Sequence, residues 1–571
     1  MANEGGLNAL GAEMANASSG SRRSRGKKNK PGRRGRHRRL RWTLGILGLV
    51  IVLLVLATGG YGLYLNSKVH RVSVSGLDQA PTKGADMNTQ NILMVGSTSR
   101  CALTVQNKAY GLCSQGVTGV NSDVIMILHL NPATKSVSIL SIPRDLFIPN
   151  ARKKGLYSQA NKIDAGLFDG PSQLVASIEE DFGIPIQRYV ELNFDTFANV
   201  VNALGGIKMY FPMPVFDAYS GLNIQTPGCH FLNGYTALQV VRARHLQYKG
   251  PGVTTNDPHY WPQEVQSDLA RIRRDHEFIR VLAAAVAKKG LGNPLTDQQL
   301  VSAVAPQLTV DSGFTASVML NMILTYHNVN PATAPQYTLP VQVDSAGSYL
   351  YKGGYYGSIE FPAYPLDQQI IDKFLGVSSN TDTMGGGTLP PPSQVTVSVL
   401  NGTGTYNQAA DTSSALTALG FHVVGVGDST PTGPQSETEV VYSSRTPADV
   451  AAAQTVAHAI SGGVIMKYGT TTDGAQVTVV TGTDFSINAP TSATSTSTQS
   501  SSASTSSPAQ SQTTSTSVLS TGAAPSTSSA LSTPAVPDTQ SASALAKPSP
   551  AVEPLSPWDP RSCTPSGGEG P

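Results

Sequence analysis

One apolar run near the N-terminus constrains this 571-residue chain more than any other feature. The 24 residues from Trp42 to Leu65 contain no charged side chain; as a helix they would extend about 36 Å. The hydrocarbon layer of a membrane is about 30 Å thick, so one tilted transmembrane helix fits the run. A secretory signal peptide is the competing interpretation, but its apolar region is usually only about 7–15 residues long and ends at a small-residue cleavage site. Tyr61 and Tyr64 suit a membrane interface.

Twelve Lys and Arg side chains lie between Arg22 and Arg41, and residues 1–41 hold only two acids. By the positive-inside rule the segment before the run is cytoplasmic and the chain from about Asn66 onward is outside the cell. The basic block could also bind nucleic acid or anionic lipid. However, no aromatic residue is interleaved before Trp42, and the other 530 residues hold 28 basic against 35 acidic side chains. We therefore expect a single-pass cell-membrane protein with its bulk in the cell wall, and no nucleic-acid partner.

Composition divides the chain into seven parts. We predict a disordered cytoplasmic tail (1–41), a transmembrane helix (42–65), a juxtamembrane linker (66–86), a large α/β domain (87–378), a Gly/Pro-rich linker (379–393), a small α/β domain (394–486) and a Ser/Thr/Pro/Ala-rich tail (487–571). The last segment has no apolar period with which to build a core, so we expect it to be disordered.

The large domain alternates apolar strands with helical patterns. Strands are predicted at 91–95, 123–130 and 137–142, and helices at 171–182, 194–204, 264–289 and 315–327. Strands that are apolar throughout are those covered by helices on both faces. The fold class is therefore α/β, with a central mixed sheet in an α/β/α layered domain.

Four cysteines suit an oxidising location outside the cell. Cys101 and Cys113 flank a loop-like stretch and are candidates for a disulfide. A zinc pair is the alternative, but no C-x-x-C motif or nearby His supports it. Cys229 is interpreted as a lone buried thiol, and Cys563, in the polar tail, as free or paired with another molecule.

Charged residues gather where strands and helices begin or end, which is where ligands of α/β sheets usually bind. Arg100 follows the first strand, Asp123 opens the second, and Arg144 and Asp145 follow the third. Arg242 and Arg244 would share one face if their segment is extended. Asp268, Arg271 and Asp275 form one stripe of a helix, with Arg274 beside it.

Arginine guanidinium groups match phosphate oxygens two at a time, and Mg²⁺ held by aspartates neutralises a pyrophosphate further. Each element also has a purely structural interpretation. Arg271, Arg273 and Arg274 could form a solvated helix face, Pro143-Arg144-Asp145 a turn with an ion pair, and Arg242 and Arg244 could pair with nearby acids. The joint occurrence of these elements is what favours a phosphate site.

Five segments, in this order, resemble the LytR-CpsA-Psr family of cell-wall glycopolymer ligases. They are NILMVGSTSR (91–100), NSDVIMILHLNPATKSVSILSIPRDLFIP (121–149), the run that begins KIDAGLFDG (162–212), LNGYTALQVVRARH (232–245) and DLARIRRDHEFI (268–279). The stretch 395–485, with VLNGTG near its start and VTGTDF at its end, is similar to the family's frequent companion, the LytR_C domain. The resemblance covers about 290 residues of the larger domain.

The resemblance implies a phosphotransferase that moves a glycan from a polyprenyl-pyrophosphate carrier to a peptidoglycan hydroxyl, the muramic acid 6-OH, and releases polyprenyl phosphate. It implies pyrophosphate ligands, a Mg²⁺ or Mn²⁺ site and catalytic residues. The ligands would be Arg100, Arg144, Arg242, Arg244, Arg271 and Arg274, the metal ligands Asp123 and Asp145, and the catalytic residues Arg144, Asp145, Arg244 and Asp268. Asp268 would fix an arginine or help to activate the acceptor. Apolar segments around the sheet would hold the lipid.

Three positions depart from the family pattern. Thr98 stands where an Asp is usual, Asn121 where an Arg is common, and Asp275 where a Gln is usual. In addition, residues 245–267 form an insertion whose His259, Tyr260 and Trp261 could stack on sugars or pack within the loop.

Two other functions use the same residues differently. A pyrophosphatase would employ water as the nucleophile at the same arginines. A wall-binding or regulatory protein would carry a degenerate site, with Thr98 as its mark and the C-terminal parts as its functional elements. The Ala/Gly/Ser/Thr-rich composition suits an actinobacterium, with arabinogalactan or another secondary wall polymer as the glycan.

Overall fold

The computed structural model describes residues 66–80, 88–99, 101, 112–116, 118–156, 158–265, 267–288, 294–330, 332–344, 347–430, 432–433, 435, 437–483, 485–488, 547–564 and 568. The predicted cytoplasmic tail, the predicted span 42–65 and Arg100 lie outside these ranges. Within them, none of the helices has the length and apolar character needed to cross a membrane.

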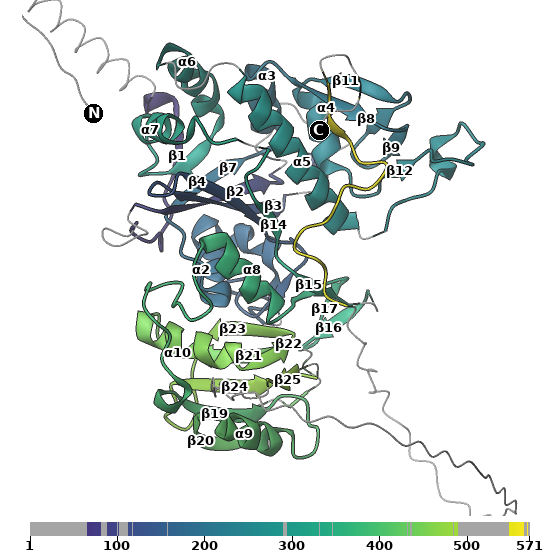
Figure 1. Ribbon diagram of the computed structural model, residues 1–571. Helices are drawn as coiled ribbons and strands as arrows, with labels where there is room; N and C mark the ends of the chain where they lie inside the picture. Colours follow the sequence, from purple (N-terminus) through teal and green to yellow (C-terminus); the bar gives the residue numbers. More distant parts are fainter. Residues whose placement is uncertain are drawn as a thin grey trace, which may run out of the picture. The chain divides into compact units, whose positions relative to one another are not determined.

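A seven-stranded sheet forms the centre of the larger domain, with the strand order β1-β13-β7-β2-β3-β4-β14 (Figure 1). β2 pairs antiparallel with β3 and parallel with β7, so the predicted mixed sheet is confirmed. In the order of the sheet, its strands are β1 (His70–Val72), β13 (Thr309–Asp311), β7 (Arg188–Leu192), β2 (Gln90–Ser97), β3 (Ser122–Asn131), β4 (Ser136–Ser141) and β14 (Gln336–Thr338).

The edge strand β1 corrects one prediction. Residues 66–86 were predicted to be a linker, but His70–Val72 pair in parallel with Thr309–Asp311. A strand of three residues is too short to give a recognisable alternating pattern.

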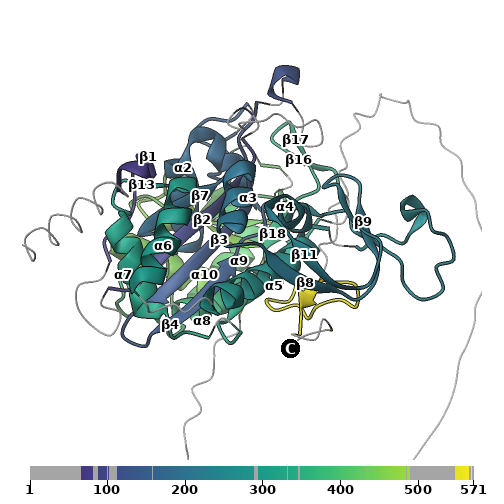
Figure 2. The same ribbon diagram turned by 90° about the horizontal axis from the view of Figure 1, so that it is seen from above.

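Helices cover both faces of the sheet (Figures 1 and 2). α2 (Pro171–Phe182) and α8 (Leu366–Leu375) lie on one face, and α3 (Phe194–Ala203), α6 (Pro294–Val304) and α7 (Ala316–Tyr326) on the other. The long helix α5 (Ser267–Ala287) contributes to cores on both sides, because Leu269 packs with Leu174 of α2 and Phe278 with Val201 of α3. The predicted helices 171–182, 194–204, 264–289 and 315–327 are confirmed to within three residues.

Local sequence sets the ends of these helices. Pro171 opens α2, where its missing N–H costs nothing, and α2 ends at Gly183, whose φ of 62° few other residues adopt easily. The Asn193 side chain accepts a hydrogen bond from the backbone N–H of Thr196, and the Thr196 hydroxyl completes a capping box at the start of α3.

A short helix, α4 (Gly234–Arg242), replaces the extended segment that was considered for Arg242 and Arg244. Asn233 caps it by accepting from the Thr236 N–H, and the chain turns extended at Ala243. The pattern ALQVV is apolar enough for either a strand or a helix, and the Asn cap decides for the helix. Arg242 therefore ends a helix, and Arg244 begins the loop after it.

Smaller strand groups surround this core. β8 (Ile207–Phe211), β11 (Gly228–Leu232) and β26 (Arg561–Ser562) form one sheet, and β9 (Val215–Asp217), β10 (Leu222–Ile224) and β12 (Gln247–Tyr248) another. Four two-stranded pairs complete the described strands outside the two main sheets. They are β5 (Phe147–Ile148) with β6 (Asn161–Lys162), β15 (Val341–Val343) with β18 (Glu360–Pro362), β16 (Tyr349–Tyr351) with β17 (Gly354–Gly357), and β22 (Ile460–Gly462) with β25 (Phe485–Ile487).

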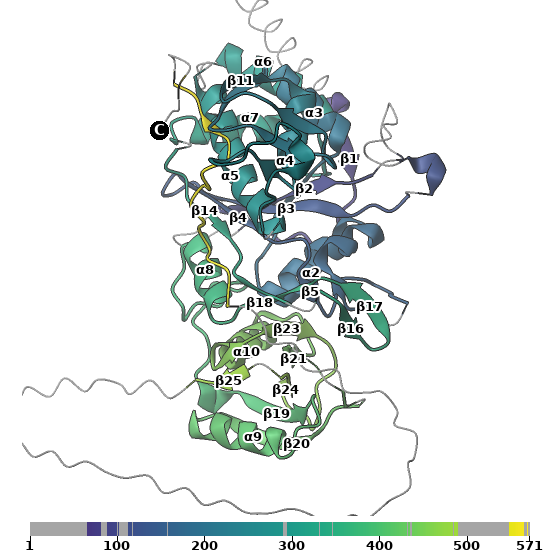
Figure 3. The same cartoon turned by 90° about the vertical axis from the view of Figure 1, so that its right-hand side faces the viewer.

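The end of the chain corrects two further predictions. Residues 547–564 were assigned to a disordered tail, but they lie along the larger domain, and Figure 3 shows them in yellow passing β14 and α5. Cys563 forms a disulfide with Cys229, with Cα atoms 5.9 Å apart, so neither is a free thiol. The pairing joins residues 334 positions apart, a relation that composition and spacing do not encode. The predicted Cys101–Cys113 disulfide is confirmed.

The second domain is a small α/β unit, as predicted. Its sheet has the order β20-β19-β24-β21-β23, and β19 pairs in parallel with both of its neighbours. The strands and helices are β19 (Thr396–Asn401), α9 (Gln408–Ala418), β20 (His422–Asp428), β21 (Thr438–Tyr442), α10 (Pro447–His458), β23 (Val464–Tyr468) and β24 (Val477–Thr481).

Candidate active site

Seven charged side chains from five segments meet beside the central sheet. We call them the charged cluster: Asp123, Arg144, Asp145, Lys162, Arg244, Asp268 and Arg271. Asp123 lies at the start of β3, Arg144 and Asp145 follow β4, and Lys162 ends β6. Arg244 follows α4, and Asp268 and Arg271 belong to the first turns of α5. The fold thus brings together residues from four of the five motifs, those at 121–149, 162–212, 232–245 and 268–279.

Asp145 has three cationic partners in the charged cluster. Its Oδ1 lies 2.8 Å from Lys162 Nζ, and its Oδ2 lies 2.9 Å from Arg244 Nη2. Arg144 Nε is 3.6 Å from the same Oδ2 and also pairs, through Nη1, with Asp123. Burial alone would raise the pKa of Asp145, but Arg144, Lys162 and Arg244 outweigh it and hold that pKa below its usual value. Asp145 is therefore a carboxylate at neutral pH.

Asp268 organises the deeper side of the cluster. Its Oδ1 is 3.2 Å from Arg244 Nε and 3.1 Å from Arg271 Nη2. The Asp268 and Arg271 side chains are only 5% and 4% exposed, whereas that of Arg244 is 23% exposed. Arg144 Nε lies 3.8 Å from the same oxygen, so Asp268 contacts three arginines.

Several carboxyl groups around the cluster have raised pKa values. Burial raises the pKa of Asp275 to about 7, although Arg271 and Arg274 oppose the rise. Burial likewise raises the pKa of Asp164 to about 7. Glu360 is buried beneath Asp145 and Asp268, and its pKa is raised well above the ordinary value by burial and then by these two acids. Some carboxyl groups of the site can therefore be protonated near neutral pH, beside the carboxylates that pair with cations.

An apolar cavity of about 310 Å³ adjoins the charged cluster. Asp123, Arg244 and Arg271 belong to both the cluster and the wall of the cavity. The rest of the wall is mainly aliphatic and aromatic, from β2, β3, β7, α3, α4 and α5, and includes Met94, Val124, Val190, Phe197, Leu238 and Ile279. A ligand with one apolar and one strongly anionic part would match this arrangement.

Buried donors in the cluster have unused hydrogen-bonding capacity. The Nε atoms of Arg144, Arg244 and Arg271 face acids within 4 Å but make no hydrogen bond of good geometry within the described part of the chain. Buried polar groups normally find partners. Planar guanidinium groups pair well with phosphate oxygens, so an anionic ligand would supply the missing acceptors.

Three of the predicted pyrophosphate ligands do not join the cluster in the same way. Arg274 is fully buried and pairs with Glu264 and Asp559, so the structure does not place it at the site. Arg242 lines the cavity, with its guanidinium 4.5 Å above the Phe194 ring. Arg100 lies outside the described residues.

Sequence reasoning missed Lys162 and Glu360. Lys162 belongs to the KIDAG segment that carried the resemblance, and a lone Lys at a strand end gives no further signal. Glu360 opens the three-residue strand β18, which pairs with β15, and its N–H donates to Asp145 O at 3.0 Å. Only the fold brings it to the site.

The substituted positions Thr98 and Asn121 interlock. The Thr98 N–H donates to Asn121 O at 2.9 Å, and the Asn121 N–H donates to the Thr98 hydroxyl at 3.0 Å. The Asn121 side chain in turn donates to Asp164 Oδ2 at 3.2 Å. The Asp164 carboxyl group therefore contacts Asn121, which in turn contacts Thr98, the position where the family usually has an Asp.

The insertion 245–267 is partly packed. Trp261 is buried and donates through Nε1 to Thr255 O at 3.1 Å. The His259 ring lies against Phe216, with centroids 4.9 Å apart, whereas Tyr260 is 77% exposed. Trp261 and His259 thus follow the packing interpretation, and Tyr260 keeps its ring accessible.

Two family models match this chain. Residues 62–360 match the LytR_cpsA_psr family, and residues 394–485 match the domain described as LytR cell envelope-related transcriptional attenuator. The two matches coincide with the two domains of the fold.

Relatives of known name come from two bacterial groups. A probable cell wall biosynthesis protein, LcpB of Corynebacterium glutamicum, is 32% identical over 254 residues, which are 44% of this chain and 54% of LcpB. The chain thus spans about half the length of that relative. The cell wall biosynthesis protein LcpA of the same organism is 24% identical over 478 residues, covering 77% of this chain and 87% of LcpA. A polyisoprenyl-teichoic acid–peptidoglycan teichoic acid transferase, TagU of Bacillus mycoides, is 27% identical over 225 residues, covering 38% of this chain and 63% of TagU.

Solved structures are also similar. A LytR-Csp2A-Psr enzyme from Actinomyces oris is 24% identical and covers 54% of this chain and 96% of its own, with a TM-score of 0.40. A structure of TagT bound to LI-WTA is 17% identical and covers 54% of this chain and all of its own, with a TM-score of 0.35.

Proposed function

The chain belongs to the LytR-CpsA-Psr family, whose model matches more than half of it, and from this membership we propose a membrane-anchored glycopolymer transferase. The proposed donor is a glycan on a polyprenyl pyrophosphate, and the proposed acceptor is a hydroxyl of peptidoglycan, the muramic acid 6-OH. Relatives named as cell wall biosynthesis proteins and as a teichoic acid transferase support this assignment.

One observation carries the proposal, namely that the charged cluster and the apolar cavity share side chains. Asp123, Arg244 and Arg271 stand where the two meet. A polyprenyl pyrophosphate has an apolar chain directly attached to two phosphates. The cavity would take the first isoprene units, and the guanidinium groups would take the phosphate oxygens.

The reaction requires little covalent chemistry from the protein. The acceptor hydroxyl attacks the phosphorus attached to the glycan, the bond from that phosphorus to the bridging oxygen breaks, and polyprenyl phosphate leaves with the bridging oxygen. The hydroxyl loses its proton as the new P–O bond forms, and the released polyprenyl phosphate takes up that proton in the sum of the reaction. Arg144, Lys162 and Arg244 would neutralise the charge that develops on the phosphate oxygens. Asp145 and Asp268 hold these cations in position before the substrate arrives.

Asp123 and Asp145 would hold the proposed Mg²⁺, or Mn²⁺ in its place. Among the described residues, no group of three or more His, Cys, Asp or Glu is placed to hold a metal ion by itself. Two carboxylates nevertheless fit the usual mode of Mg²⁺, which takes one or two carboxylates and completes its shell with substrate phosphates and water. When bound, the ion would make lipid phosphate a better leaving group.

The apolar run Trp42–Leu65 would anchor the enzyme beside its lipid-linked donor. Twelve basic residues before the run would keep the N-terminus in the cytoplasm and the two domains outside. A reporter fused to the N-terminus that is protected from protease in intact cells, while the domains are cleaved, would support this orientation.

The decisive experiment uses the full-length chain in detergent, with a farnesyl-pyrophosphate-linked disaccharide, Mg²⁺ and a peptidoglycan oligomer. A phosphodiester between disaccharide and muropeptide, detected by mass spectrometry, is the expected product. Free disaccharide phosphate would instead identify a pyrophosphatase. Absence of turnover under conditions where the donor binds would identify a non-catalytic wall protein.

A further inference from the structure

Residues 547–564, near the end of the chain, lie beside α5, which carries Arg273 and Arg274. Residues 547–564 follow the larger domain through backbone hydrogen bonds from Ser549 N–H to Val341 O and from Thr338 N–H to Ala551 O, each 2.8 Å. Further on, β26 adds a strand beside β8, and Cys563 closes the disulfide with Cys229. We call residues 547–564 the C-terminal segment. It is therefore attached by strand pairing and by a covalent bond.

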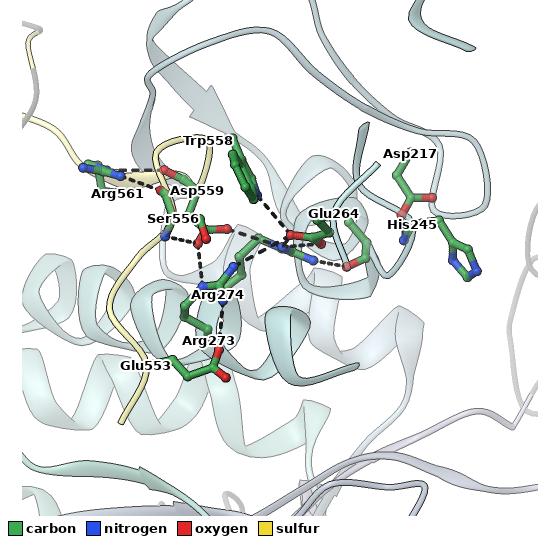
Figure 4. Close-up of polar contacts among 11 residues, drawn as sticks. Asp217, His245, Glu264, Arg273, Arg274, Glu553, Ser556, Trp558, Asp559 and Arg561 are labelled. Carbon is green, nitrogen blue, oxygen red and sulfur yellow. Dashed lines mark hydrogen bonds and ion pairs between the residues drawn. The ribbon is translucent and has the colours of Figure 1, made fainter. Parts of the chain in front are cut away.

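In the C-terminal segment, Trp558 and Asp559 contact α5 and the loop before it (Figure 4). Asp559 is fully buried, and its Oδ2 lies 2.6 Å from Arg273 Nε. Its Oδ1 lies 3.4 Å from Arg274 Nη1. Trp558 stacks on Tyr248, with ring centroids 3.9 Å apart, and donates through Nε1 to Glu264 at 3.1 Å. The segment thus brings a carboxylate to a buried arginine.

Arg274, which pairs with Asp559, in turn binds the backbone next to Arg244. Its guanidinium lies between two acids, Glu264 at 2.7 Å and Asp559, and its Nη2 donates to the carbonyl of Ala243. Ala243 follows the last residue of α4, where helix carbonyls have no partner within the helix. Arg274 therefore caps the C-terminal end of α4.

Arg244 lies between two backbone groups that are held by hydrogen bonds, the Ala243 carbonyl and the His245 N–H. On its other side, the N–H of His245 donates to the buried carboxylate of Asp217 at 2.8 Å. Both peptide units that flank Arg244 are thus held by buried charged side chains (Figure 4). The direction in which the Arg244 side chain leaves the backbone is consequently set by Asp217 and Arg274.

We propose that Asp559 is a positioning residue for the phosphate site, acting through Arg274 and the Ala243 carbonyl on Arg244. A buried guanidinium needs anionic partners to offset the cost of its desolvation and to hold it in place. Glu264 alone is a weaker partner, because burial raises its pKa despite the opposing effect of Arg274. Asp559 supplies the second carboxylate, and the disulfide keeps it there. The proposal rests on the proposed function, since it concerns affinity for the pyrophosphate of that substrate.

The test compares Asp559→Asn with Glu553→Gln in the full-length chain. Asp559→Asn keeps the side-chain shape but removes the charge that faces Arg274. Glu553→Gln is the matched control, because Glu553 joins the same segment to Arg273 at 2.9 Å, whereas the acids that pair with Arg274 are Glu264 and Asp559. Two probes are titrated into each protein by calorimetry, farnesyl pyrophosphate and farnesol, which share the apolar chain and differ in the phosphates.

Asp559→Asn is expected to weaken farnesyl pyrophosphate roughly tenfold and to leave farnesol within about twofold. Glu553→Gln should leave both unchanged. Equal losses for the two probes, or equal losses in the two variants, would show a merely structural role and overturn the proposal. Unchanged binding in Asp559→Asn would also overturn it. If the wild-type chain binds farnesol but not farnesyl pyrophosphate, the proposed function itself fails.

A second variant covers the case in which Asp559→Asn does not fold. Glu264→Gln removes the other carboxylate that holds Arg274 and should produce the same selective loss of the pyrophosphate probe. The difference in tryptophan fluorescence between each protein and its Trp558→Phe counterpart reports whether the segment still lies on Tyr248. A folded Glu264→Gln protein with wild-type affinity for farnesyl pyrophosphate would contradict the proposal.

Discussion

Arg244 and Asp145, 99 residues apart in the sequence, lie in contact, with Nη2 of the arginine 2.9 Å from Oδ2 of the carboxylate. The same carboxylate group also holds Lys162 and lies near Arg144. A single acid thus orders three cations at the edge of the cavity. This arrangement makes the two residues the most informative places at which to test the site.

We expect Arg244→Ala to lower kcat/KM for transfer by about 10²–10³-fold, because a preorganised donor to the phosphate oxygens is lost. Arg244→Lys should recover only part of the activity, since an ammonium group cannot contact Asp145 and Asp268 in the forked manner of the guanidinium. The measurement is the initial rate of phosphodiester formation by the full-length protein.

Arg280→Ala is the matched control for this substitution. Arg280 lies on α5 and pairs with Glu277 at 2.7 Å, away from the charged cluster. Its removal should leave the rate within about twofold, because its ion-pair partner Glu277 is not part of the charged cluster. Wild-type rates in Arg244→Ala would remove Arg244 from the site.

The affinity for a pyrophosphate diester should fall as the pH rises through 7. Below that pH Asp275 is mostly protonated and does not offset the positive charge of Arg271; above it, the Asp275 carboxylate repels the anion. The charge of a diester does not change in this range. If the bound phosphates raise the Asp275 pKa by about one unit, the dissociation constant grows about tenfold between pH 6 and 9.

Titration of farnesyl-pyrophosphate-linked disaccharide at several pH values measures this effect, with Asp275→Asn as the comparison. The variant lacks the titrating group and should show a flatter profile. A profile as steep as that of the wild-type protein would assign the pH dependence to another group.

We expect Thr98→Asp to destabilise the domain and to leave Mg²⁺ affinity unchanged. Thr98 is 4% exposed and interlocked with Asn121, so a new carboxylate there would be buried, at a cost of about 1–3 kcal/mol. Thr98→Asn, similar in size and uncharged, is the control. Thermal unfolding and calorimetric titration with MgCl₂ measure the two quantities, and a gain in Mg²⁺ affinity would place position 98 among the metal ligands.

Replacing Cys229 and Cys563 by Ser should lower the free energy of unfolding by about 2–4 kcal/mol, because the cross-link no longer restricts the unfolded chain. Replacing Cys101 and Cys113, which lie only 12 positions apart, should cost less, because they close a far shorter loop. Chemical denaturation of the two double variants makes the comparison. Peptide mapping without reductant should first recover the 229–563 pair from the wild-type protein.

The sequence predicted elements whose pattern is long and local. Strands β2, β3 and β4 and helices α2, α3, α5 and α7 have clear apolar periods, and their ends carry recognisable caps such as Asn193. The convergence of Asp123, Arg144, Asp145, Arg244, Asp268 and Arg271 was predicted because the family motifs contain them. The short helix α4 was not, because the pattern of ALQVV suits either period and only Asn233 distinguishes them.

Features that depend on contacts between residues far apart in the chain could not be predicted from the sequence. Lys162 and Glu360 lie in strands of two and three residues, β6 and β18, which are too short to have a periodic signature. Arg274 has the same spacing on α5 as a ligand would have, but Asp559 and Glu264 claim its charge. A polar, proline-containing end of a chain gives no sign that one Asp and one Cys within it have partners some 290 to 330 residues earlier.

The disulfide between Cys229 and Cys563 also changes what a protease could accomplish. Residues 489–546 connect the second domain to the C-terminal segment, and both neighbours of this stretch are attached to folded parts, Asn488 to Ala459 and Ser549 to Val341. A nick within the stretch would divide the polypeptide without releasing its last part. The cleaved enzyme would retain Asp559 beside Arg274 as a two-chain molecule, until a reductant separates them.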